Sequence, residues 1–390
     1  MKRICIVTTT RADWGLLMPL ARLLRDTPGV EIAIVASNMH LMDRFGMTIN
    51  EITDAGFEVA ARVPMDVDGD DEASRAKAAA TCMAGMATTF ARLKPDAVLL
   101  LGDRYEMLAV ASAATIMRIP IIHIAGGAVS EGAVDDCIRH AISKLASLHL
   151  TETEEYRRRV IQMGETPDRV IDTGAIGVWN ALNIQPLPKD ALEAYLGMNL
   201  DGDVAVVTYH PATNDSSSTP ASQVEAMLTA LDAFPDMKCV ITYPNNDAGG
   251  ASTVPILQAY ADMHPDRVRL VPSLGMFRYL SMLKIAAVVI GNSSSGIVEV
   301  PSAGIPTVDI GIRQRGRTAA SSVIHCGNSC HDIESAIRQA LSPEFRAMAS
   351  QGINPYFKPD TPALMTEAIL HFMDTLPAAP KTFYNIDFTS

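Results

Sequence analysis

The stretch IIHIAGGAVSEGAVDDCIRH, residues 121–140, places acidic side chains shortly after a run of apolar residues. A Gly-Gly pair follows the run, and Asp135 and Asp136 open a segment with helical spacing. Carboxylates held near a strand end can transfer protons. Acidic residues also stabilise the first turn of a helix, and Asp136 has the spacing of an intrahelical pair with Arg139 or His140. The spacing alone leaves both interpretations open.

Asp103 and His210 are further candidates for acid/base chemistry. Asp103, in LLLGDRYE, ends a very apolar strand, where limited hydration suits a general base. The alternative is that it caps the helix that starts near Tyr105. His210, in TYHPAT, stands at a strand end beside a proline, where an imidazole can bond a phosphate or move a proton. A purely structural histidine is an equal alternative.

The segment GNSSSGIVEV carries the clearest phosphate-binding pattern in the chain. Small hydroxyl residues and a glycine begin a helix directly after a buried strand, so free N–H groups and the hydroxyls of Ser293 and Ser294 can point at a diphosphate. Glu299, further along, can accept hydrogen bonds from ribose hydroxyls. The alternative is a serine cap with a solvent-exposed glutamate. The chain has neither a P-loop nor a GxGxxG fingerprint.

Two arginines follow the first and the last clear strands. Arg11 lies in TTTRAD and Arg313 in DIGIRQRGR. A guanidinium presents a planar fork of donors that matches a phosphate. Taken singly, arginines at such positions are more often surface residues.

The pattern of the whole chain predicts an α/β fold. Short β-branched runs without alternation are separated by amphipathic segments, which indicates parallel strands covered on both faces. The 390 residues favour two domains. The proline-containing segment NIQPLPKDALEAYLGMNLDGD interrupts the pattern between them. We predict an N-terminal Rossmann-like domain over 1–182, a C-terminal one over 183–360, and a helix and tail over 361–390 that pack back on the first; PAAPKTF, after the helix, is expected to be solvated.

Polar clusters follow several of the predicted strands. In open parallel sheets, ligands bind beyond the carboxyl ends of the strands. The clusters are TTTRAD, ASNMH, LGDRYE, HIAGG, TYHPAT, TYPNND, GNSSSG and GIRQRGR. We therefore expect the site in a cleft that both halves face.

Composition excludes several classes of partner. Asp and Glu number 44 against 32 Lys and Arg, so the net charge of −12 argues against nucleic acid or an anionic membrane. Six scattered cysteines indicate reduced thiols, and the pair Cys326 and Cys330 lacks the further ligands of a zinc site. The apolar stretch at the N-terminus is too short for a signal peptide. We expect a cytoplasmic protein without metal or cofactor.

Taken in order, these clusters resemble the hydrolysing UDP-N-acetylglucosamine 2-epimerase family. These enzymes make N-acetylmannosamine for sialic acid synthesis and have close relatives in legionaminic acid pathways. The resemblance covers about nine tenths of the chain, and it rests on many segments in one order, among them TTTRADWGLLMPL, NMHLMDRFGMT, GDRYEMLA, GAVDDCIRHAISKLASLHL, YHPAT, PSLGMFRYLSMLK and GNSSSGIVEVPSAGIPTVDIGIRQRGR.

The resemblance implies a glycosyltransferase-B-type fold, a UDP-sugar substrate and a homodimer. The implied reaction eliminates UDP with loss of the C2 proton and then hydrates the 2-acetamidoglucal with inverted stereochemistry at C2. By motif, Asp103 and Asp135 match acids assigned to proton transfer, and His210 stands at the diphosphate. The predicted UDP and sugar contacts are Arg11, His40, Arg104, Ser273, Leu274, Gly275, Asn292, Ser293, Ser294, Glu299 and Arg313.

The chain departs from the family at two positions. The family commonly has an acid or histidine two positions after the strand-end histidine and an acid directly after Gly-Gly, where this chain has Ala125 and Ala128. Alanine transfers no proton. Three explanations compete: Glu131 on the same loop takes over the role, the enzyme accepts a modified sugar that needs an apolar wall, or the chain binds nucleotide without efficient turnover.

We rank retained activity first, because the other nucleotide and proton-transfer positions are kept together. The predicted substrate is UDP-N-acetylglucosamine or a 4-acetamido-6-deoxy relative such as UDP-N,N'-diacetylbacillosamine. The alternatives are a glycosyltransferase of the same fold and a catalytically impaired UDP-sugar-binding protein.

Overall fold

The computed structural model describes residues 1–43, 46–65, 69, 71–131, 133–211, 218–244, 250–376 and 381–387. Most of the residues that follow His210 in YHPAT, and those that follow Pro244 in YPNND, therefore lie outside the described part of the chain. Contacts divide the chain into two compact units. Unit 1 comprises Met1–Ala128, Asp135–Trp179 and Lys358–Ser390, and unit 2 comprises Val129–Val134 and Asn180–Phe357.

This division differs in three details from the predicted one, and the smallest is that unit 1 resumes at Lys358 and not at residue 361. The sequence places the boundary after residue 182, whereas the contacts change from unit 1 to unit 2 after Trp179. The segment Val129–Val134 groups with unit 2, although its neighbours on both sides belong to unit 1. Its backbone contacts explain this, because the N–H of Glu131 donates to the carbonyl of Arg315 at 3.2 Å.

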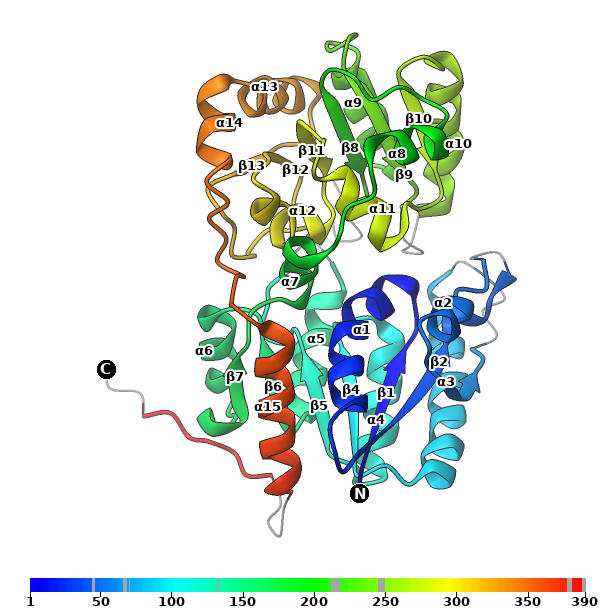
Figure 1. Cartoon of the computed structure of the whole chain (residues 1–390), viewed down its shortest axis with the longest axis vertical. Helices are drawn as coiled ribbons and strands as arrows, with labels where there is room; N and C mark the ends of the chain where they lie inside the picture. The colour runs from blue at the N-terminus through cyan, green and yellow to red at the C-terminus, as the bar shows by residue number, and fades with distance from the viewer. Residues whose placement is uncertain are drawn as a thin grey trace. The chain divides into compact units, whose positions relative to one another are not determined.

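Unit 1 is built on a parallel sheet with the order β3-β2-β1-β4-β5-β6-β7 within the described residues (Figure 1). Its strands are β1 (Lys2–Thr8), β2 (Val30–Ser37), β3 (Val59–Val63), β4 (Ala97–Leu101), β5 (Ile121–Ile124), β6 (Leu148–Thr151) and β7 (Val170–Asp172). Its helices are α1 (Arg11–Arg25), α2 (Ile49–Asp54), α3 (Glu72–Leu93), α4 (Tyr105–Ile116), α5 (Asp135–Leu145), α6 (Glu154–Gln162) and α15 (Thr361–Asp374), and α7 (Ile176–Asn183) contains the division from unit 2.

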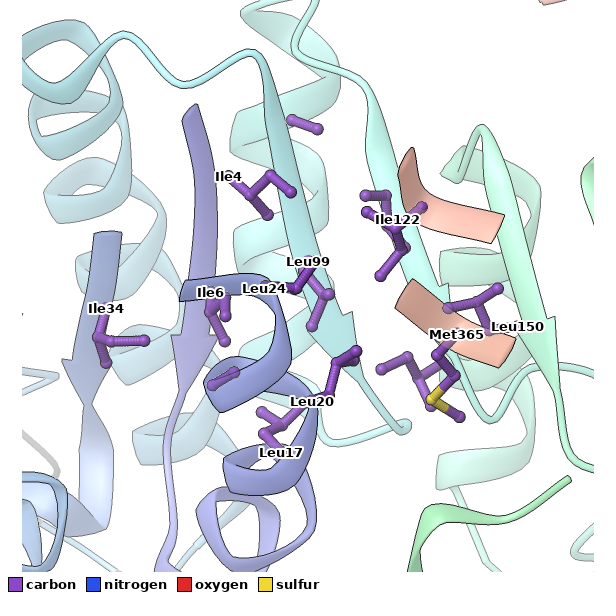
Figure 2. Packing of buried hydrophobic residues seen from close by; sticks show 14 of the residues in the cluster. Ile4, Ile6, Leu17, Leu20, Leu24, Ile34, Leu99, Ile122, Leu150 and Met365 are labelled. Carbon is purple, nitrogen blue, oxygen red and sulfur yellow. The ribbon is translucent and has the colours of Figure 1, made fainter. Parts of the chain in front are cut away.

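Both faces of this sheet are buried, which explains why its strands lack polar alternation. Ile4 and Ile6 of β1 belong to a cluster with α1 and α15, whereas Cys5 and Val7 belong to a cluster with α3 and α4. Figure 2 shows the first cluster, in which leucines of α1 and Met365 of α15 pack on apolar side chains of the sheet, among them Ile6 and Leu99. Successive residues of a strand point to opposite faces, so continuous apolar runs fit a sheet covered on both sides.

The C-terminal helix α15 is part of the unit 1 core. Met365, Ile369 and Phe372 are at most 3% exposed and lie in the same cluster as β1 and β4. Lys2 and Asp374 form an ion pair that links the first strand to the end of this helix. The helix therefore stabilises the sheet on which the N-terminal candidate residues stand.

The described part of the tail, 381–387, is not wholly solvated, which corrects the expectation for PAAPKTF. Lys381 donates to two carbonyl oxygens around the end of α5 and forms an ion pair with Oε2 of Glu165 at 2.7 Å. The N–H of Tyr384 donates to the carbonyl of Gly164 at 2.9 Å. Composition gave no sign of these contacts, because they depend on acceptors far away in the sequence.

We predict that Glu165 makes unfolding sensitive to acid. Burial by itself raises the pKa of Glu165, but hydrogen bonds from His149, Lys144 and Lys381 outweigh it and lower the pKa to about 2 from the ordinary 4.5. A depressed pKa in the folded state adds stability above pH 4.5 that is lost as the pH falls toward 2. Glu165→Gln should therefore flatten this pH dependence, measured as the free energy of urea unfolding between pH 5 and 2.5.

The control for this prediction is Glu334→Gln, which changes a carboxylate on the outer surface of α13 (Cys330–Ala340). It should keep the acid dependence of the wild type. An equally steep loss of stability in the Glu165 variant would contradict the prediction.

Unit 2 contains a second parallel sheet, with the order β10-β9-β8-β11-β12-β13 within the described residues. Its strands are β8 (Val204–Thr208), β9 (Lys238–Thr242), β10 (Val268–Val271), β11 (Val288–Gly291), β12 (Thr307–Ile310) and β13 (Val323–Cys326). Its other helices are α8 (Lys189–Leu196), α9 (Pro220–Leu231), α10 (Gly250–Met263), α11 (Gly275–Met282), α12 (Ser294–Val298) and α14 (Pro343–Ala349).

This sheet repeats the two-sided burial of the first. Val207 and Ile290 pack in a cluster with α9 and α13, whereas Val206 and Val289 pack in a cluster with α8 and α11. The predicted α/β class with two parallel sheets is confirmed. In the described part of the chain, no helix has the length and apolarity needed to cross a bilayer.

Candidate active site

The β1–α1 turn of unit 1 is organised by a carboxylate. Asp13 accepts hydrogen bonds from the N–H groups of Thr9 and Thr10, both at 2.9 Å, and from the hydroxyl of Thr8 at 2.7 Å. The hydroxyl of Thr10 in turn accepts from the N–H of Asp13, which forms a capping box. The turn thus has a defined shape, and it presents Arg11 as the first residue of α1.

Arg11 and His40, both predicted to bind substrate, have different surroundings. The side chain of Arg11 is 32% exposed and lies 3.6 Å from Oε1 of Glu51. His40 has no exposed surface, and its ring nitrogens lie 3.0 Å from the hydroxyl of Thr8 and 2.9 Å from that of Thr48. Burial lowers the pKa of His40. In this structure His40 supports the turn and presents no atom to a ligand, which departs from the expectation.

Asp103 lies two residues beyond the end of β4 and is bound by a buried arginine. Nε of Arg139 donates to Oδ2 of Asp103 at 2.8 Å, and Nη2 binds the same oxygen. The N-cap of α4 is Arg104, so Asp103 does not cap that helix and this alternative is wrong. The ion pair stabilises the negative charge of Asp103. A carboxylate in this form can accept a proton.

Arg139 also fixes the loop that leads into α5. Its Nη1 donates to the carbonyl of Ala128 at 2.9 Å and to Oδ1 of Asp136 at 3.3 Å. Only 1% of Arg139 is exposed. One buried guanidinium therefore joins the end of β4, the β5–α5 connection and the first turn of α5.

The two adjacent acids of α5 have different roles in the structure. Asp136 forms the intrahelical contacts that its spacing indicated, with Arg139 and with Nε2 of His140 at 3.6 Å. Burial lowers the pKa of His140. Asp135 is the first residue of the helix and is half-buried. Its role in proton transfer stays a prediction.

Ala125 and Ala128 occupy unusual positions after β5. Ala125 has a φ of +66°, in the left-handed region that alanine rarely adopts. Ala128 is 1% exposed and its carbonyl accepts from Arg139. Because the side chain of Ala128 is buried, it does not form an exposed apolar wall for a sugar.

We predict that Ala125→Gly stabilises the protein. Glycine adopts a positive φ without the steric cost that alanine carries, so the free energy of unfolding should rise by about 0.5–1 kcal/mol in urea denaturation. The matched variant Ala128→Gly removes a buried methyl group and should lower the free energy of unfolding. Equal destabilisation by both substitutions would contradict the assigned strain.

In unit 2, His210 and Asn292 hold two strand ends together. Oδ1 of Asn292 accepts from the N–H of His210 at 2.7 Å, and Nδ2 of Asn292 donates to the carbonyl of His210 at 2.7 Å. These residues follow β8 and β11, which are neighbours in the sheet. Both are at most 4% exposed. Asn292 thus positions the backbone of His210 through both groups of its amide.

The serine-rich segment begins α12, as the sequence predicts. Ser293 occupies the N-cap position, yet its hydroxyl makes no capping hydrogen bond, and Ser294 is exposed. Burial raises the pKa of Glu299, which follows the helix. Oε2 of Glu299 is buried and has no hydrogen-bond partner among the described residues. Ser293 is therefore the N-cap residue that the alternative expected, but the glutamate of that alternative is not solvated.

The loop after β12 converges on the same place. Nη1 of Arg313 and Nε2 of Gln314 donate to the carbonyl of Asn292 at 3.2 and 2.8 Å. The structure thus brings Arg313, Asn292, His210 and the start of α12 together within unit 2. Glu131 also belongs to unit 2, is exposed, and is linked through its backbone to Arg315. Its catalytic role stays a prediction.

Ser273, Leu274 and Gly275, which are among the predicted UDP and sugar contacts, lie at the start of α11. The hydroxyl of Ser273 accepts from the N–H of Gly275 at 3.1 Å. Leu274 is 2% exposed and belongs to a unit 2 core cluster, so its side chain is unavailable to a ligand. The backbone groups of this turn are the ones that can bind a nucleobase.

Comparison with known proteins shows the family of the chain. The sequence pattern of the family described as UDP-N-acetylglucosamine 2-epimerase matches residues 22–370. The chain belongs to this family.

Two relatives of this UDP-N-acetylglucosamine 2-epimerase family member are similar along most of their length. A Campylobacter jejuni protein named GDP/UDP-N,N'-diacetylbacillosamine 2-epimerase (hydrolyzing) is 37% identical over 345 residues, 88% of this chain and 89% of that protein. An Escherichia coli protein named polysialic acid biosynthesis protein P7 is 34% identical over 386 residues, 99% of this chain and 98% of that protein.

A solved structure supports the fold of this epimerase family member. The S. aureus MnaA structure with UDP has a TM-score of 0.76 and 18% sequence identity, and the match covers 98% of this chain and all of that one. Together with the two parallel sheets, this confirms the predicted two-sheet, glycosyltransferase-B-type fold. Among the described residues, no group of three or more His, Cys, Asp or Glu gathers in a way that could hold a metal ion.

Sequence reasoning missed four polar residues that support the candidate site of this epimerase: Asp13, Asn38, Glu106 and Arg139. Each is at most 5% exposed and forms a hydrogen bond with a residue that follows β1 or β4. Asp13 and Glu106 lie within two or three residues of a predicted site residue, which was a usable sign. The partners of Asp13 are also close in the sequence, whereas Asn38 lies 68 residues from Glu106 and Asp103 lies 36 residues from Arg139.

Proposed function

We propose that this chain is a hydrolysing 2-epimerase acting on a UDP-linked 2-acetamido sugar. The observation that carries the proposal is the family match over residues 22–370. The named activity of the Campylobacter jejuni relative supports a substrate such as UDP-N-acetylglucosamine or UDP-N,N'-diacetylbacillosamine. The products would be UDP and the free 2-epimerised amino sugar.

Unit 1 would supply the acid/base groups. The proposed base is Asp103, which Arg139 keeps charged and oriented, with Asp135 as the second proton-transfer group. Arg11 and Arg104 would bind phosphate oxygens, because a guanidinium fork matches them. Removal of the C2 proton breaks the bond between C1 and the UDP oxygen and gives a 2-acetamidoglucal and UDP. Water then adds its hydroxyl to C1, and a proton returns to C2 on the opposite face.

Unit 2 would bind the nucleotide. We propose that the diphosphate binds to His210 and to the start of α12, with Ser293 and Ser294. Arg313 would neutralise its negative charge. The unpaired buried oxygen of Glu299 suits a ribose hydroxyl, which can donate the hydrogen bond that the described residues do not supply. Ser273 to Gly275 are proposed for the uracil.

Three finer features complete the proposal. The name of the Escherichia coli relative supports a role in sialic acid synthesis. A role in legionaminic acid synthesis is proposed from the family resemblance. The six cysteines, all within the described residues, are free thiols, which supports a reducing compartment such as the cytoplasm. A homodimer is proposed from the family resemblance. A glycosyltransferase activity is not favoured, because the matching family and the named relatives are epimerases.

Incubation with each UDP sugar in deuterated water tests the function. We expect release of UDP without any acceptor sugar, together with deuterium at C2 of the free product, followed by NMR. UDP release that requires an acceptor would favour a glycosyltransferase. UDP binding without release or exchange would favour a binding protein and would reject the proposal.

A further inference from the structure

Behind Arg104 lies a fully buried carboxylate that no step of the proposed reaction uses. Glu106 has no exposed surface, and its Oε1 accepts hydrogen bonds from Nε of Arg104 at 2.7 Å and from Nδ2 of Asn38 at 2.8 Å. Asn38 follows β2, and Arg104 and Glu106 follow β4. All three therefore lie at the carboxyl ends of strands in unit 1, where the candidate site residues stand.

The geometry of this cluster carries a cost in stability. Asn38 has a φ of +48°, in the left-handed region. Oε2 of Glu106 and Oδ1 of Asn38 are both buried without a hydrogen-bond partner among the described residues. A buried, half-satisfied ion pair is less stable than apolar side chains of the same size. Such a costly arrangement beside a strand end is typical of a group that positions a functional residue.

The direction of the contact indicates which residue is positioned. Glu106 binds the Nε edge of the guanidinium, and we assign the Nη groups to the phosphate. The side chain of Arg104 is 23% exposed, whereas that of Glu106 is fully buried. Glu106 cannot contact a ligand itself and can act only through its neighbours.

We infer that Glu106, aligned by Asn38, is a positioning residue that sets the orientation of Arg104 for binding the UDP diphosphate. This inference rests on the proposed function and deepens it. A long arginine side chain loses conformational freedom when it binds a ligand. Fixing its Nε edge in advance reduces that loss and raises the affinity for the nucleotide.

Isothermal titration calorimetry with UDP tests the inference directly. Glu106→Ala should weaken UDP binding by about tenfold or more, as expected for loss of a charge-assisted hydrogen bond that orients the binding group. Glu106→Gln keeps an oxygen that accepts from both Arg104 and Asn38, so it should recover most of the lost affinity. If Glu106→Ala does not fold, Glu106→Gln provides the test. Its neutral oxygen accepts a weaker hydrogen bond from Arg104 than the carboxylate does, so KM for the UDP sugar should rise by a few fold while kcat is unchanged.

A double-mutant cycle separates positioning from a general structural effect. In an Arg104→Ala background, Glu106→Ala should change the UDP affinity by less than about twofold, because the residue it acts through is gone. The matched control is Glu334→Ala on α13. It removes a carboxylate whose Oε1 lies 2.7 Å from Nη2 of Arg338. That variant should bind UDP like the wild type.

The outcomes distinguish the inference from the proposed function. Wild-type protein that fails to bind UDP would reject the proposed function and this inference with it. If the wild type binds UDP and Glu106→Ala binds it with the same affinity, the inference alone is overturned. Independent, additive losses in the double mutant would also overturn it, because Glu106 would then act by a route other than Arg104.

Discussion

Asp103→Asn should lower kcat by about 10²–10⁴ while UDP affinity changes by less than about threefold. Asparagine keeps an oxygen that can accept from Arg139, so the local geometry is retained. It cannot accept the C2 proton, however, because its amide is not basic. The loss should therefore fall on the chemical step. Coupled measurement of UDP release gives kcat, and calorimetry gives the affinity.

The same strand provides a matched control at its opposite end. Asp96 precedes β4 and accepts from the backbone N–H of Arg3 at 2.7 Å. Asp96→Asn makes the same chemical change at the end of β4 away from Asp103 and should leave kcat unchanged. An unaltered kcat in Asp103→Asn would remove this residue from the mechanism. Equal losses in both variants would point to a general effect on unit 1.

Gly291→Ala should destabilise unit 2 and abolish UDP binding. Gly291 ends β11 with a φ of +136°, and an added Cβ would overlap the backbone carbonyl oxygen of its strand neighbour Thr208. Backbone atoms cannot move aside as a flexible side chain can, so we expect a loss of about 3 kcal/mol or more. The displaced strand end carries Asn292, which holds His210. Urea denaturation and UDP calorimetry measure the two effects.

Gly202→Ala is the control for this prediction. Gly202 also has a positive φ, +83°, but an added Cβ there would meet no atom within 4 Å. This variant carries only the conformational cost of alanine, about 1 kcal/mol, and should bind UDP normally. If Gly291→Ala proved no more destabilising than Gly202→Ala, the close strand approach would not hold the site together.

The candidate site was partly predictable because several of its residues belong to local patterns. A serine-rich turn after an apolar run indicates a helix start after a strand, and the structure has β11 followed by α12 at that place. The threonine-rich turn before Arg11 likewise forms the start of α1. The role of His40 in substrate binding stays a prediction, but the sequence gave no sign that this residue is buried. Its burial depends on Thr8 and Thr48 from other elements.

The sequence by itself determined the class of fold, because strands buried on both faces need continuous apolar runs and the helices between them need a single apolar face. It also determined the family. Only the tertiary structure decided which polar groups that are distant in the sequence meet. Asp103 binds Arg139 from 36 residues away, Asn38 binds Glu106 across 68, and His210 bonds to Asn292 across 82. These pairs depend on which strands lie side by side, and the local pattern of a strand does not encode its neighbours.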